Sequence, residues 1–356
     1  ESLLRQLAIV TAFGWVIALI FLYSPSYAQA PPISASGLNT QVSAPINLPN
    51  GKVQLNITGG TRPGGGTNLF HSFGDFNVPT NNIANFLNNS GLPTTNILGR
   101  ITGGNPSSIF GMIQTNGPGG FPNANLFLLN PAGFLFGPNA TLNVGGMVTF
   151  TTADYMRLTD NTRFNAVTGP ADLLLTAAPV AAFGFLGNNP AAIAIQGSKL
   201  QVADGKALSF VGGNQGITAT DPDTGNPIPV PGGTTMTGGK LLAPGGQINI
   251  ASVAGPGEIS AVDFTPTPGM TLGSISLSQG ALLDVSADAA GTVRIRGGQL
   301  VMDNATISAD TGTSNGALLA VDIAVTGSVS ISSNQAPAIT ARATDTGNTG
   351  EIRLAA

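Results

Sequence analysis

The residue types needed for acid–base catalysis are scarce in this chain, and one short segment brings three of them together. His71 is the single histidine, with Ser72 beside it and Asp75 four residues on, so the members of a Ser/His/Asp triad occur there. The same segment is rich in phenylalanine, which is usually buried. We therefore interpret His71 as a histidine of the core or of a sheet edge, and we predict no catalytic residue.

Metal and cofactor sites are also not expected. With one histidine and no cysteine, the chain lacks the usual ligands of a zinc site. The segment 221–226 is similar to the beginning of a calcium loop, but Gly225 and Gly232 occupy the fifth and twelfth positions, where such a loop needs oxygen ligands. The glycines between 59 and 66 are not followed by Gly-Lys-Ser/Thr, so they predict a loop and not a phosphate site.

Charged side chains that could form a polysaccharide-cleaving site are dispersed. A polysaccharide lyase or hydrolase needs several carboxylates, or carboxylates with Arg or Lys, on one face. The tightest group alternates with apolar positions and could lie on one solvated face, where ion pairing is the expected outcome. It comprises Asp284, Arg294, Arg296 and Asp303. A secreted lyase or hydrolase stays open as the alternative to a protein that is not an enzyme.

Composition restricts the fold class further. Only 8% of the 356 residues are charged, against about 25% in ordinary soluble domains, while 49 glycines and 25 prolines supply many turns. The hydrophobic content of 42% and the net charge of −4 favour a folded core over disorder. The 13 Lys and Arg residues are scattered singly, so nucleic-acid binding, which needs a basic patch, is not expected.

Short strand patterns repeat along most of the chain. Fragments such as GGQINI, GSISL, GTVRI, GSVSI and GEIRL share the template Gly-x-apolar-x-apolar. They recur at irregular spacings of roughly 18–35 residues, which is typical of solenoid coils with loops of varying length. One coil cannot bury its apolar side alone, so coils must stack. We predict an all-β fold, a single-stranded right-handed parallel β-helix (a pectin-lyase-like solenoid) with an N-terminal cap and small polar residues on the outside.

The N-terminal segment predicts export. Arg5 precedes an apolar run over residues 7–23, and Ser26-Tyr27-Ala28 forms a small-x-small cleavage site. We predict a signal-peptide helix over residues 1–28. The alternative is an uncleaved membrane anchor, which the helix-breaking Pro25 disfavours. The absence of cysteine suits a chain that passes unfolded through a second pore, because disulfides formed in an oxidising periplasm would block it.

Three ordered blocks carry a resemblance to a known family. They are NLFHSFGDFNVP (68–79), ILGRITGGNPSSIFGMI (97–113) and NANLFLLNPAGFLFGPNATLNVGGMVTFTTAD (123–154). The chain over about residues 36–190 resembles the N-terminal secretion domain (haemagglutination activity domain) of filamentous-haemagglutinin-type exoproteins, the cargo of two-partner secretion, in the form common in cyanobacteria. The resemblance implies a β-helix that a separate outer-membrane β-barrel transporter recognises. It also implies that the chain crosses the outer membrane unfolded and folds coil by coil outside.

One turn in these blocks aligns with a motif of the family. The motif is Asn-Pro-Asn-Gly, and the matching residues are Asn130-Pro131-Ala132-Gly133, with Ala132 in place of the second asparagine. The residues alone predict a turn between two strands, because Pro131 presets φ and Gly133 tolerates a positive φ. The resemblance implies a further role in transporter recognition for Asn130, Pro131 and Gly133. For the family's Asn-Pro-Asn-Leu motif, the nearest segment is 88–92, which is not a clean match.

Phenylalanine usage suggests how the chain is divided. Thirteen of the 17 phenylalanines fall between residues 45 and 190, and only two follow. We predict a linker over residues 29–44, the two-partner secretion domain over 45–190 and a β-helical repeat region over 191–356. The last strand pattern has no polar cap, so we expect the natural chain to continue beyond Ala356.

These expectations describe a secreted or cell-surface, adhesin-like exoprotein that reaches its location through the periplasm and the outer membrane. Adhesion itself is implied by the resemblance, with host cells, polysaccharides or self-association as the expected targets. No cofactor is expected. A toxin-delivery stalk would need a C-terminal toxin domain, which the printed sequence does not contain.

Overall fold

The computed structural model describes residues 31–334 and 337–356. The predicted signal peptide and its alternative, a membrane anchor, lie outside the described residues. In the described part, no helix is long and apolar enough to cross a membrane. Residues 32–356 belong to one structural unit.

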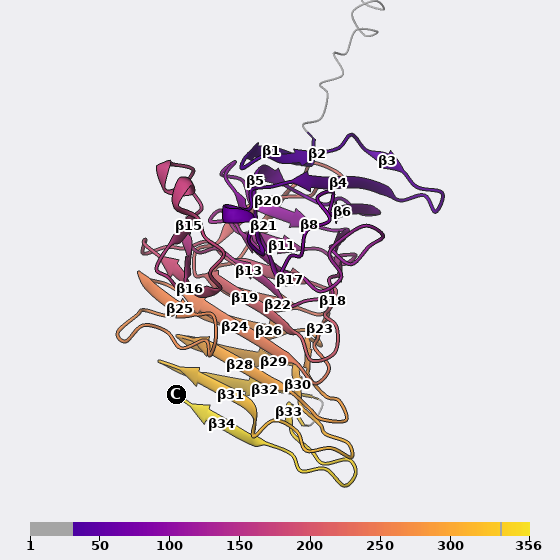
Figure 1. Ribbon diagram of the computed structural model, residues 1–356. Helices are drawn as coiled ribbons and strands as arrows, with labels where there is room; N and C mark the ends of the chain where they lie inside the picture. The colour runs from indigo at the N-terminus through magenta and orange to yellow at the C-terminus, as the bar shows by residue number, and fades with distance from the viewer. Residues whose placement is uncertain (1–30, 335–336) are drawn as a thin grey trace, which may run out of the picture. The chain divides into compact units, whose positions relative to one another are not determined.

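Three long sheets, mostly parallel, form this unit (Figure 1). Sheet 1 has ten strands, in the spatial order β1 (Ile33–Gly37), β5 (Asn68–Phe76), β7 (Asn96–Ile101), β10 (Asn125–Leu129), β13 (Val148–Thr151), β19 (Ala207–Gly213), β24 (Gln247–Val253), β28 (Thr292–Gly297), β31 (Leu319–Val325) and β34 (Glu351–Ala355). Sheet 2 has seven strands, in the order β8 (Ser107–Ile109), β11 (Phe134–Phe136), β17 (Ile193–Gln196), β22 (Thr234–Thr237), β26 (Ser274–Ser278), β29 (Gln299–Asp303) and β32 (Val329–Ser332).

Sheet 3 consists of two groups of strands that meet where β12 contacts β18. The first group is β2 (Thr40–Val42), β4 (Val53–Gly59), β6 (Asn82–Phe86), β9 (Met112–Gln114) and β12 (Thr141–Asn143), with β3 (Ile46–Asn47) paired to β4 and the short 3-10 helix η1 (Pro63–Gly65) after it. The second group is β18 (Lys199–Gln201), β23 (Lys240–Leu242), β27 (Leu282–Asp284), β30 (Thr306–Ser308) and β33 (Ile339–Thr340).

From β7 to β33, each coil of chain contributes one strand to each sheet, as β10, β11 and β12 do, and successive coils pair in parallel. Leu126 of β10, for example, lies between Ile97 of β7 and Val148 of β13. This is a parallel β-helix, so the predicted fold class is confirmed. The stacking follows from the sequence pattern, because each coil presents an apolar inner side that only its neighbours can cover.

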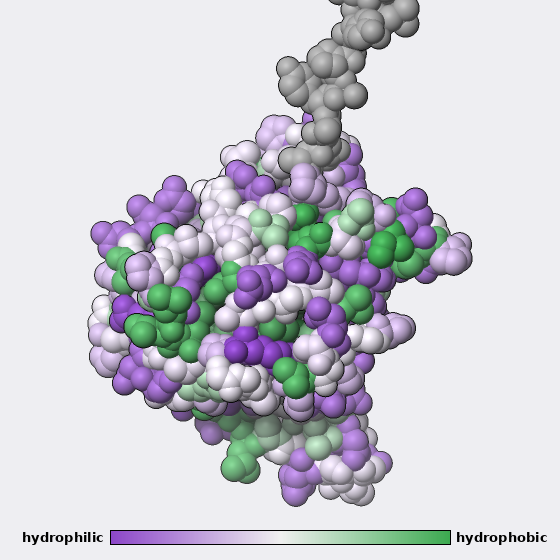
Figure 2. Space-filling model, turned by 45° about the horizontal axis from the view of Figure 1, so that its top comes forward, coloured by the Kyte–Doolittle hydropathy of each residue, from purple (hydrophilic) through white to green (hydrophobic). Residues whose placement is uncertain are grey.

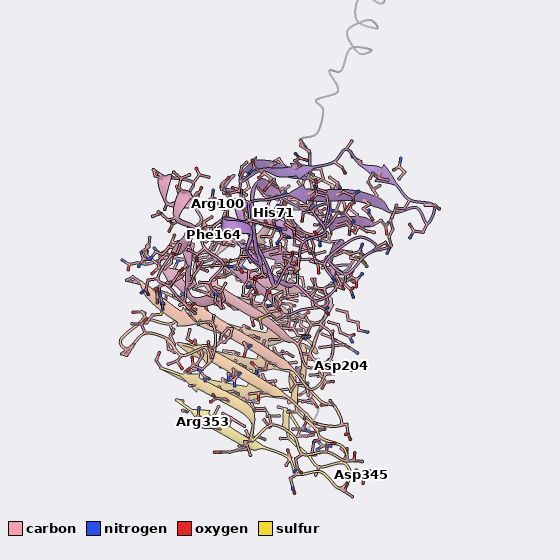
Figure 3. All side chains as sticks on the ribbon, in the orientation of Figure 1. His71, Arg100, Phe164, Asp204, Asp345 and Arg353 are labelled. Carbon is pink, nitrogen blue, oxygen red and sulfur yellow. The ribbon has the colours of Figure 1, made fainter. Side chains whose placement is uncertain are left out.

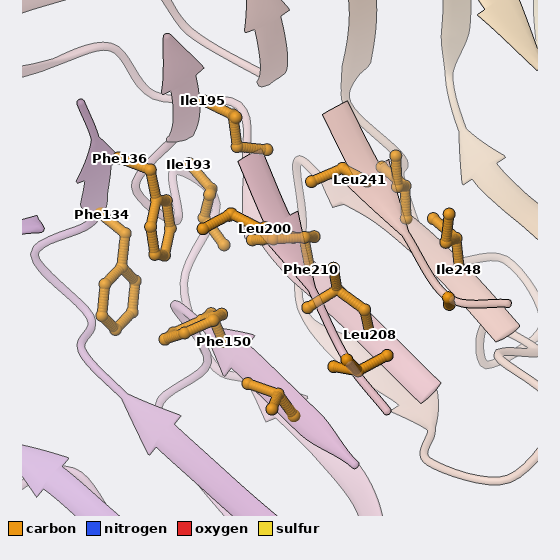
Figure 4. Close-up of a cluster of buried hydrophobic side chains, with 14 of the residues drawn as sticks. Phe134, Phe136, Phe150, Ile193, Ile195, Leu200, Leu208, Phe210, Leu241 and Ile248 are labelled. Carbon is orange, nitrogen blue, oxygen red and sulfur yellow. The ribbon is translucent and has the colours of Figure 1, made fainter. Parts of the chain in front are cut away.

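Large apolar side chains fill the interior between the three sheets. Figure 4 shows Phe134 and Phe136 from sheet 2 beside Phe150 and Phe210 from sheet 1, and Leu200 from sheet 3. All five side chains are fully buried. The ring centroids of Phe136 and Phe150 are 4.7 Å apart in an edge-to-face arrangement, which stabilises aromatic pairs beyond the burial of their surface.

Three excursions interrupt the coils, and all three leave at one corner, between a strand of sheet 1 and the next strand of sheet 2. Residues 152–192 contain β14 (Tyr155–Leu158), β15 (Arg163–Asn165), the 3-10 helix η2 (Pro170–Leu174) and β16 (Val180–Phe185). Residues 214–233 contain the hairpin β20 (Ile217–Thr220) and β21 (Pro227–Val230), and residues 254–273 contain β25 (Gly257–Ser260). The first and third excursions together form the antiparallel sheet 4, in the order β15-β14-β16-β25.

The excursions set the length of each coil. A plain coil separates Asn96 from Asn125 by 29 residues, whereas the coil with the first excursion separates Thr151 from Val211 by 60. The predicted spacing of 18–35 residues is therefore wrong for coils that carry an excursion.

Sheet 4 packs on the outer side of sheet 1 and changes the residues found there. Phe70, Phe127 and Leu129 point away from the interior of the β-helix, yet they are buried in a second apolar cluster with Met156 and Phe183 of sheet 4. The expectation of small polar residues on the outside is wrong at these positions, because another sheet and not water covers them. The hairpin β20–β21 covers part of sheet 2 in the same way.

The predicted linker over residues 29–44 contains two strands and forms the N-terminal cap. β1 pairs antiparallel with β5, and β2 pairs antiparallel with β4, so the two strands cover the first edges of sheets 1 and 3. Leu38 and Asn39, with φ values of 51° and 54°, make the turn between them. A cap was predicted without a position, and this segment was interpreted as a linker. Edge strands need such a cover because their free backbone groups would otherwise pair with another chain.

No break in the sheets occurs near residue 190. β13 pairs with β19 in sheet 1, and β11 pairs with β17 in sheet 2, so strands from both sides of this position lie side by side. The segments 45–190 and 191–356 thus share one continuous core.

Candidate functional site: the turn between β10 and β11 and its surroundings

The Asn130 side chain connects two successive turns of the β-helix. Its Nδ2 atom donates hydrogen bonds to the Asn105 carbonyl oxygen and to Ser107 Oγ, each at 3.0 Å. Its Oδ1 atom accepts a hydrogen bond from the Ala132 amide at 3.0 Å, and its carbonyl accepts one from the Gly133 amide at 3.0 Å. Asn130 is 1% exposed. The predicted turn is present, and the asparagine that defines it is directed inward.

Gly133 is required by both conformation and space. Its φ is 110°, a value that L side chains rarely adopt. A Cβ atom there would lie 2.6 Å from Ile217 Cδ1 of the hairpin β20–β21 and 2.9 Å from the Ala192 carbonyl oxygen. Pro131 and Ala132 are partly exposed, so they are the part of this turn that reaches solvent. Ala132 is the position at which the family motif has its second asparagine.

The segment 88–92 lies at a different corner. It follows β6 of sheet 3 and precedes β7, whereas the Asn130 turn lies at the opposite ends of the sheet 1 strands. Asn88 Nδ2 donates to the Leu92 carbonyl oxygen at 3.1 Å, and Ser90 Oγ donates to Asn88 Oδ1 at 3.0 Å, so the segment forms its own exposed turn. The fold does not bring the two candidate motifs together.

Two ladders of side-chain amides connect the first coils, and neither was predicted from the sequence. On sheet 3, Asn85 donates to Asn56, Gln114 to Asn85 and Asn143 to Gln114, each at 2.9 Å. On sheet 1, Asn125 donates to Asn96 and Asn96 to Asn68, each at 2.8 Å. The signal was present as amide side chains that recur every 28 or 29 residues. Such ladders favour one register, because a slip would leave buried amides unpaired.

A buried ion pair fastens sheet 4 to sheet 1 and was also missed. Arg100 of β7 is 1% exposed, and its guanidinium donates to both carboxylate oxygens of Asp172 in η2, at 2.7 and 2.6 Å. Its Nε donates to Ser72 Oγ at 3.0 Å, and its Cζ lies 5.3 Å from the centroid of the Phe164 ring. Figure 3 shows Arg100 close to Phe164 on this side of the molecule.

A second ion pair joins the two excursions that form sheet 4. Glu258 of β25 accepts hydrogen bonds from Arg157 of β14 and from the Tyr155 hydroxyl, at 2.8 to 3.0 Å. The hydrogen bonds from Arg157 hold the pKa of the Glu258 carboxyl below its usual value. Burial, together with the hydrogen bond to Glu258, raises the pKa of Tyr155.

The residues of the possible Ser/His/Asp triad have other partners. His71 is 1% exposed, its Nδ1 lies 3.2 Å from Thr40 Oγ1, and burial lowers its pKa to about 3. Ser72 Oγ contacts Ser36 and Arg100. Asp75 accepts a hydrogen bond from Asn105. His71 is therefore a core histidine, as interpreted from its phenylalanine neighbours.

A Gly-x-Ser-x-Gly sequence at residues 312–316 is a further place where a nucleophilic serine could be sought. Ser314 Oγ there donates to Asp288 Oδ2 at 2.6 Å, and hydrogen bonds from Ser314 and Thr313 lower the pKa of Asp288 to about 2. His71 lies in β5, at the capped end of the β-helix, and this segment precedes β31 near the other end.

The charged residues considered for a polysaccharide-cleaving site do not share one face. Arg294 and Arg296 lie in β28 of sheet 1, Asp303 in β29 of sheet 2 and Asp284 in β27 of sheet 3. Arg296 pairs with Asp322 of β31, and Arg353 of β34 pairs with the same carboxylate. The interpretation that the four could share a face is wrong, whereas ion pairing is present for Arg296.

The possible calcium loop is the tip of the hairpin β20–β21. Asp221 Oδ1 accepts hydrogen bonds from the amides of Asp223 and Thr224, and Asp223 Oδ1 accepts one from the Thr80 amide. The described residues contain no cluster of three His, Cys, Asp or Glu side chains arranged for a metal ion.

A sequence model of the TPS (two-partner secretion) secretion domain matches residues 30–295 of the chain. The chain belongs to this family. A TPS secretion domain is part of an exoprotein of two-partner secretion, so the protein is a secreted exoprotein with an extracellular or surface location and an outer-membrane transporter as its export partner. The family is one of secretion domains and not of enzymes. The match continues past residue 190, as the sheets do.

Solved structures of other TPS secretion domains are similar to this chain. The filamentous hemagglutinin secretion domain has a TM-score of 0.48 and 16% identity, covering 92% of this chain and 100% of that one. The HMW1 secretion domain from Haemophilus influenzae has a TM-score of 0.37 and 15% identity, covering 85% of this chain and 84% of that one. The comparison with curated proteins gives no match.

Proposed function

We propose that the TPS secretion domain presents its first folded coils to the outer-membrane transporter, and that it belongs to an adhesin-like exoprotein. The observation that carries the proposal is the family match over residues 30–295, which includes the cap, the amide ladders and the Asn130 turn. The same match underlies the export route through the periplasm and outer membrane, which starts with the signal peptide predicted over residues 1–28.

The Asn130 turn supports recognition indirectly. Because Asn130 is 1% exposed, it acts on the transporter only through the shape it gives to the turn. Gly133 keeps the hairpin β20–β21 close to the same turn. Pro131 and Ala132 are then the residues that the transporter touches.

We propose that folding outside the cell makes export directional. The parallel, in-register stacking of the coils supports this proposal. Each new strand pairs with a strand already in place, for example β13 with β10 and β19 with β13. The amide ladders add a second row of hydrogen bonds to the early coils. A chain that emerges coil by coil therefore gains stability at each step, and returning through the pore would require these bonds to break.

The proposal is tested by co-expressing the protein with its cognate transporter and measuring the fraction in the medium. Asn130→Ala and Gly133→Val are expected to retain the protein in the periplasm, and deletion of residues 126–144 is expected to abolish secretion. Asn139→Ala, an exposed asparagine in the next turn, is the matched control and is expected to be secreted normally. Normal secretion of the deletion would contradict the proposed role.

A second measurement separates recognition from stability. Ala132→Asn restores the family motif at a partly exposed position. It is expected to bind the purified periplasmic domains of the transporter at least as tightly as the natural sequence does, with an unchanged melting temperature. Pro131→Ala is expected to weaken that binding without unfolding the protein.

The proposed adhesive role is supported by the family and by the extended surface of the β-helix. The view in Figure 2 shows a surface of mainly polar and weakly polar residues with apolar patches between them. Host cells, polysaccharides and other copies of the protein are the proposed targets. Attachment of cells that secrete the protein, compared with cells in which the transporter is deleted, tests this part of the proposal.

A further inference from the structure

A groove with a volume of about 800 Å³ lies on the outer side of sheet 1, beyond the region that sheet 4 covers. Its floor crosses neighbouring strands and includes Thr149, Ser209 and Asn249, which occupy the same position on β13, β19 and β24. One wall comes from sheet 4 and the loop after β25, and the other from the turns that precede the strands of sheet 1. The excursions thus turn a flat sheet face into a groove.

The floor has hydroxyl groups whose hydrogen-bonding capacity is not used. Thr149 is 3% exposed, and its hydroxyl has no hydrogen-bond partner among the described residues. Ser209 is also 3% exposed; its Oγ accepts a hydrogen bond from Asn249 Nδ2 at 3.1 Å, which leaves the hydroxyl proton without an acceptor in the described part of the chain. Solvent reaches the Thr149 hydroxyl, so water or a ligand in the groove can supply the missing hydrogen bond.

The walls add apolar surface and almost no charge. Val180 and Val262 line the sheet 4 side, and Val262 is 78% exposed although it is apolar. Among the described residues that line the groove, Lys206 is the one charged side chain. Arg294 of β28, next to Asn249 in the sheet, borders the floor, and its guanidinium donates a hydrogen bond to Gln247 Oε1 at 2.8 Å. Gly205 lies exposed on the opposite rim, and no other atom lies within 4 Å of the position that a Cβ would take there.

The backbone of the floor excludes an added peptide strand. β13, β19 and β24 each pair with a strand on both sides, so their amides and carbonyls are already used in the sheet. A ligand on this floor must bond to hydroxyl and amide side chains that repeat at the strand spacing of about 4.8 Å. It must also place an apolar surface against the valines of the wall.

We infer that this groove binds a neutral, linear oligosaccharide. Sugar rings combine hydroxyl groups along their edges with apolar C–H faces, which matches a floor of Thr149, Ser209 and Asn249 beside a wall of Val180 and Val262. A chain of sugars can follow the groove across several strands. The groove is separate from the Asn130 turn, so the inference does not depend on transporter recognition.

The test uses the chain from Gln29 onward, produced without export, and titrates it by calorimetry with neutral hexasaccharides of the glucose, xylose, mannose and N-acetylglucosamine series. Saturable binding of at least one of them is expected. Thr149→Val and Ser209→Ala are each expected to weaken binding about fivefold to tenfold, the effect of one lost hydrogen bond. Ala289→Trp, at the exposed rim, is expected to block the groove and abolish binding.

The same titrations include a control variant and can give results that overturn the inference. Ser276→Ala makes the same change as Ser209→Ala on sheet 2, away from the groove, and is expected to leave binding unchanged. Binding of a hexagalacturonate or an extended peptide in place of every neutral sugar overturns the inference, as does no binding at all or binding that Ala289→Trp leaves intact. Secretion of the same variants is measured in parallel. Normal secretion without sugar binding contradicts the groove inference alone, whereas loss of secretion concerns the proposed secretion function.

Discussion

Arg100 and Asp172 are 72 residues apart in sequence and form a two-point ion pair between β7 and η2. Arg100 is almost completely buried, while the Asp172 side chain is 18% exposed. The pair therefore adds a polar attachment to the apolar cluster that holds sheet 4 on the outer side of sheet 1. Its partners Ser72 and Phe164 belong to the same two layers.

Removing only the Asp172 carboxylate is expected to lower the free energy of unfolding much more than replacing both Arg100 and Asp172. Asp172→Ala leaves Arg100 buried without its counter-charge and should lower the free energy of unfolding by about 3 kcal/mol. The double change Arg100→Met with Asp172→Ala should be closer to the natural protein. Chemical denaturation measures both, with Asp204→Ala, an exposed aspartate whose carboxylate makes no hydrogen bond among the described residues, as the control. Equal losses in the single and double variants would contradict this account.

Glu258 is expected to make the stability of sheet 4 depend on pH. Its folded pKa lies below the usual 4.5, so the ion pair with Arg157 stabilises the fold above about pH 4.5, and this stabilisation is lost as the pH falls through the lower folded pKa. Glu258→Gln should cost about 1 kcal/mol at pH 7, because the pair is partly exposed, and less at pH 3. Thermal unfolding at both pH values tests this, with Glu351→Gln on the exposed β34 as the matched substitution.

His71 should produce a pH effect at higher pH. The folded protein keeps this side chain neutral down to about pH 3, whereas an unfolded histidine binds a proton below about pH 6.5. Stability contributed by the neutral form is therefore lost as the pH falls from 6.5 towards 3. Between pH 6.5 and 5 the loss should be about 2 kcal/mol. A His71→Gln variant, which cannot titrate, should lack this component, and identical pH profiles would refute the assignment.

Fragments test where the folding unit ends. A fragment of residues 32–190 lacks β19 to pair with β13, β17 to pair with β11, and β25 to pair with β16. It is expected to be aggregated or partly unfolded by circular dichroism and hydrogen exchange. A fragment of residues 32–297 keeps all four strands of sheet 4 and should unfold cooperatively. Cooperative unfolding of the shorter fragment would restore a boundary near residue 190.

The sequence was sufficient to predict the β-helix because its signal is local and repeated. Gly-x-apolar-x-apolar fragments became strands such as β24 and β28, and the glycine and proline content became turns. The same reasoning identified the Asn130 turn, since Pro131 and Gly133 define it without reference to distant residues.

Sheet 4 and the groove were not predictable in this way. β16 pairs with β25, and the Arg157–Glu258 contact spans 101 residues, so no local period indicates either. The positions of outward residues such as Phe127 in the sequence do not indicate that another layer covers them. The cap over residues 33–42 was interpreted as a linker because its short antiparallel strands lack the Gly-x-apolar-x-apolar pattern.

The shared origin of the excursions at one corner has a consequence for any chain that leaves a pore N-terminal end first. β14, β15 and β16 emerge early and must wait, with one edge uncovered, until β25 arrives two coils later. When β25 pairs with β16, the third of three successive coils becomes hydrogen-bonded to the first through sheet 4. Backward slippage from that moment would have to unlock a whole layer and not a single strand.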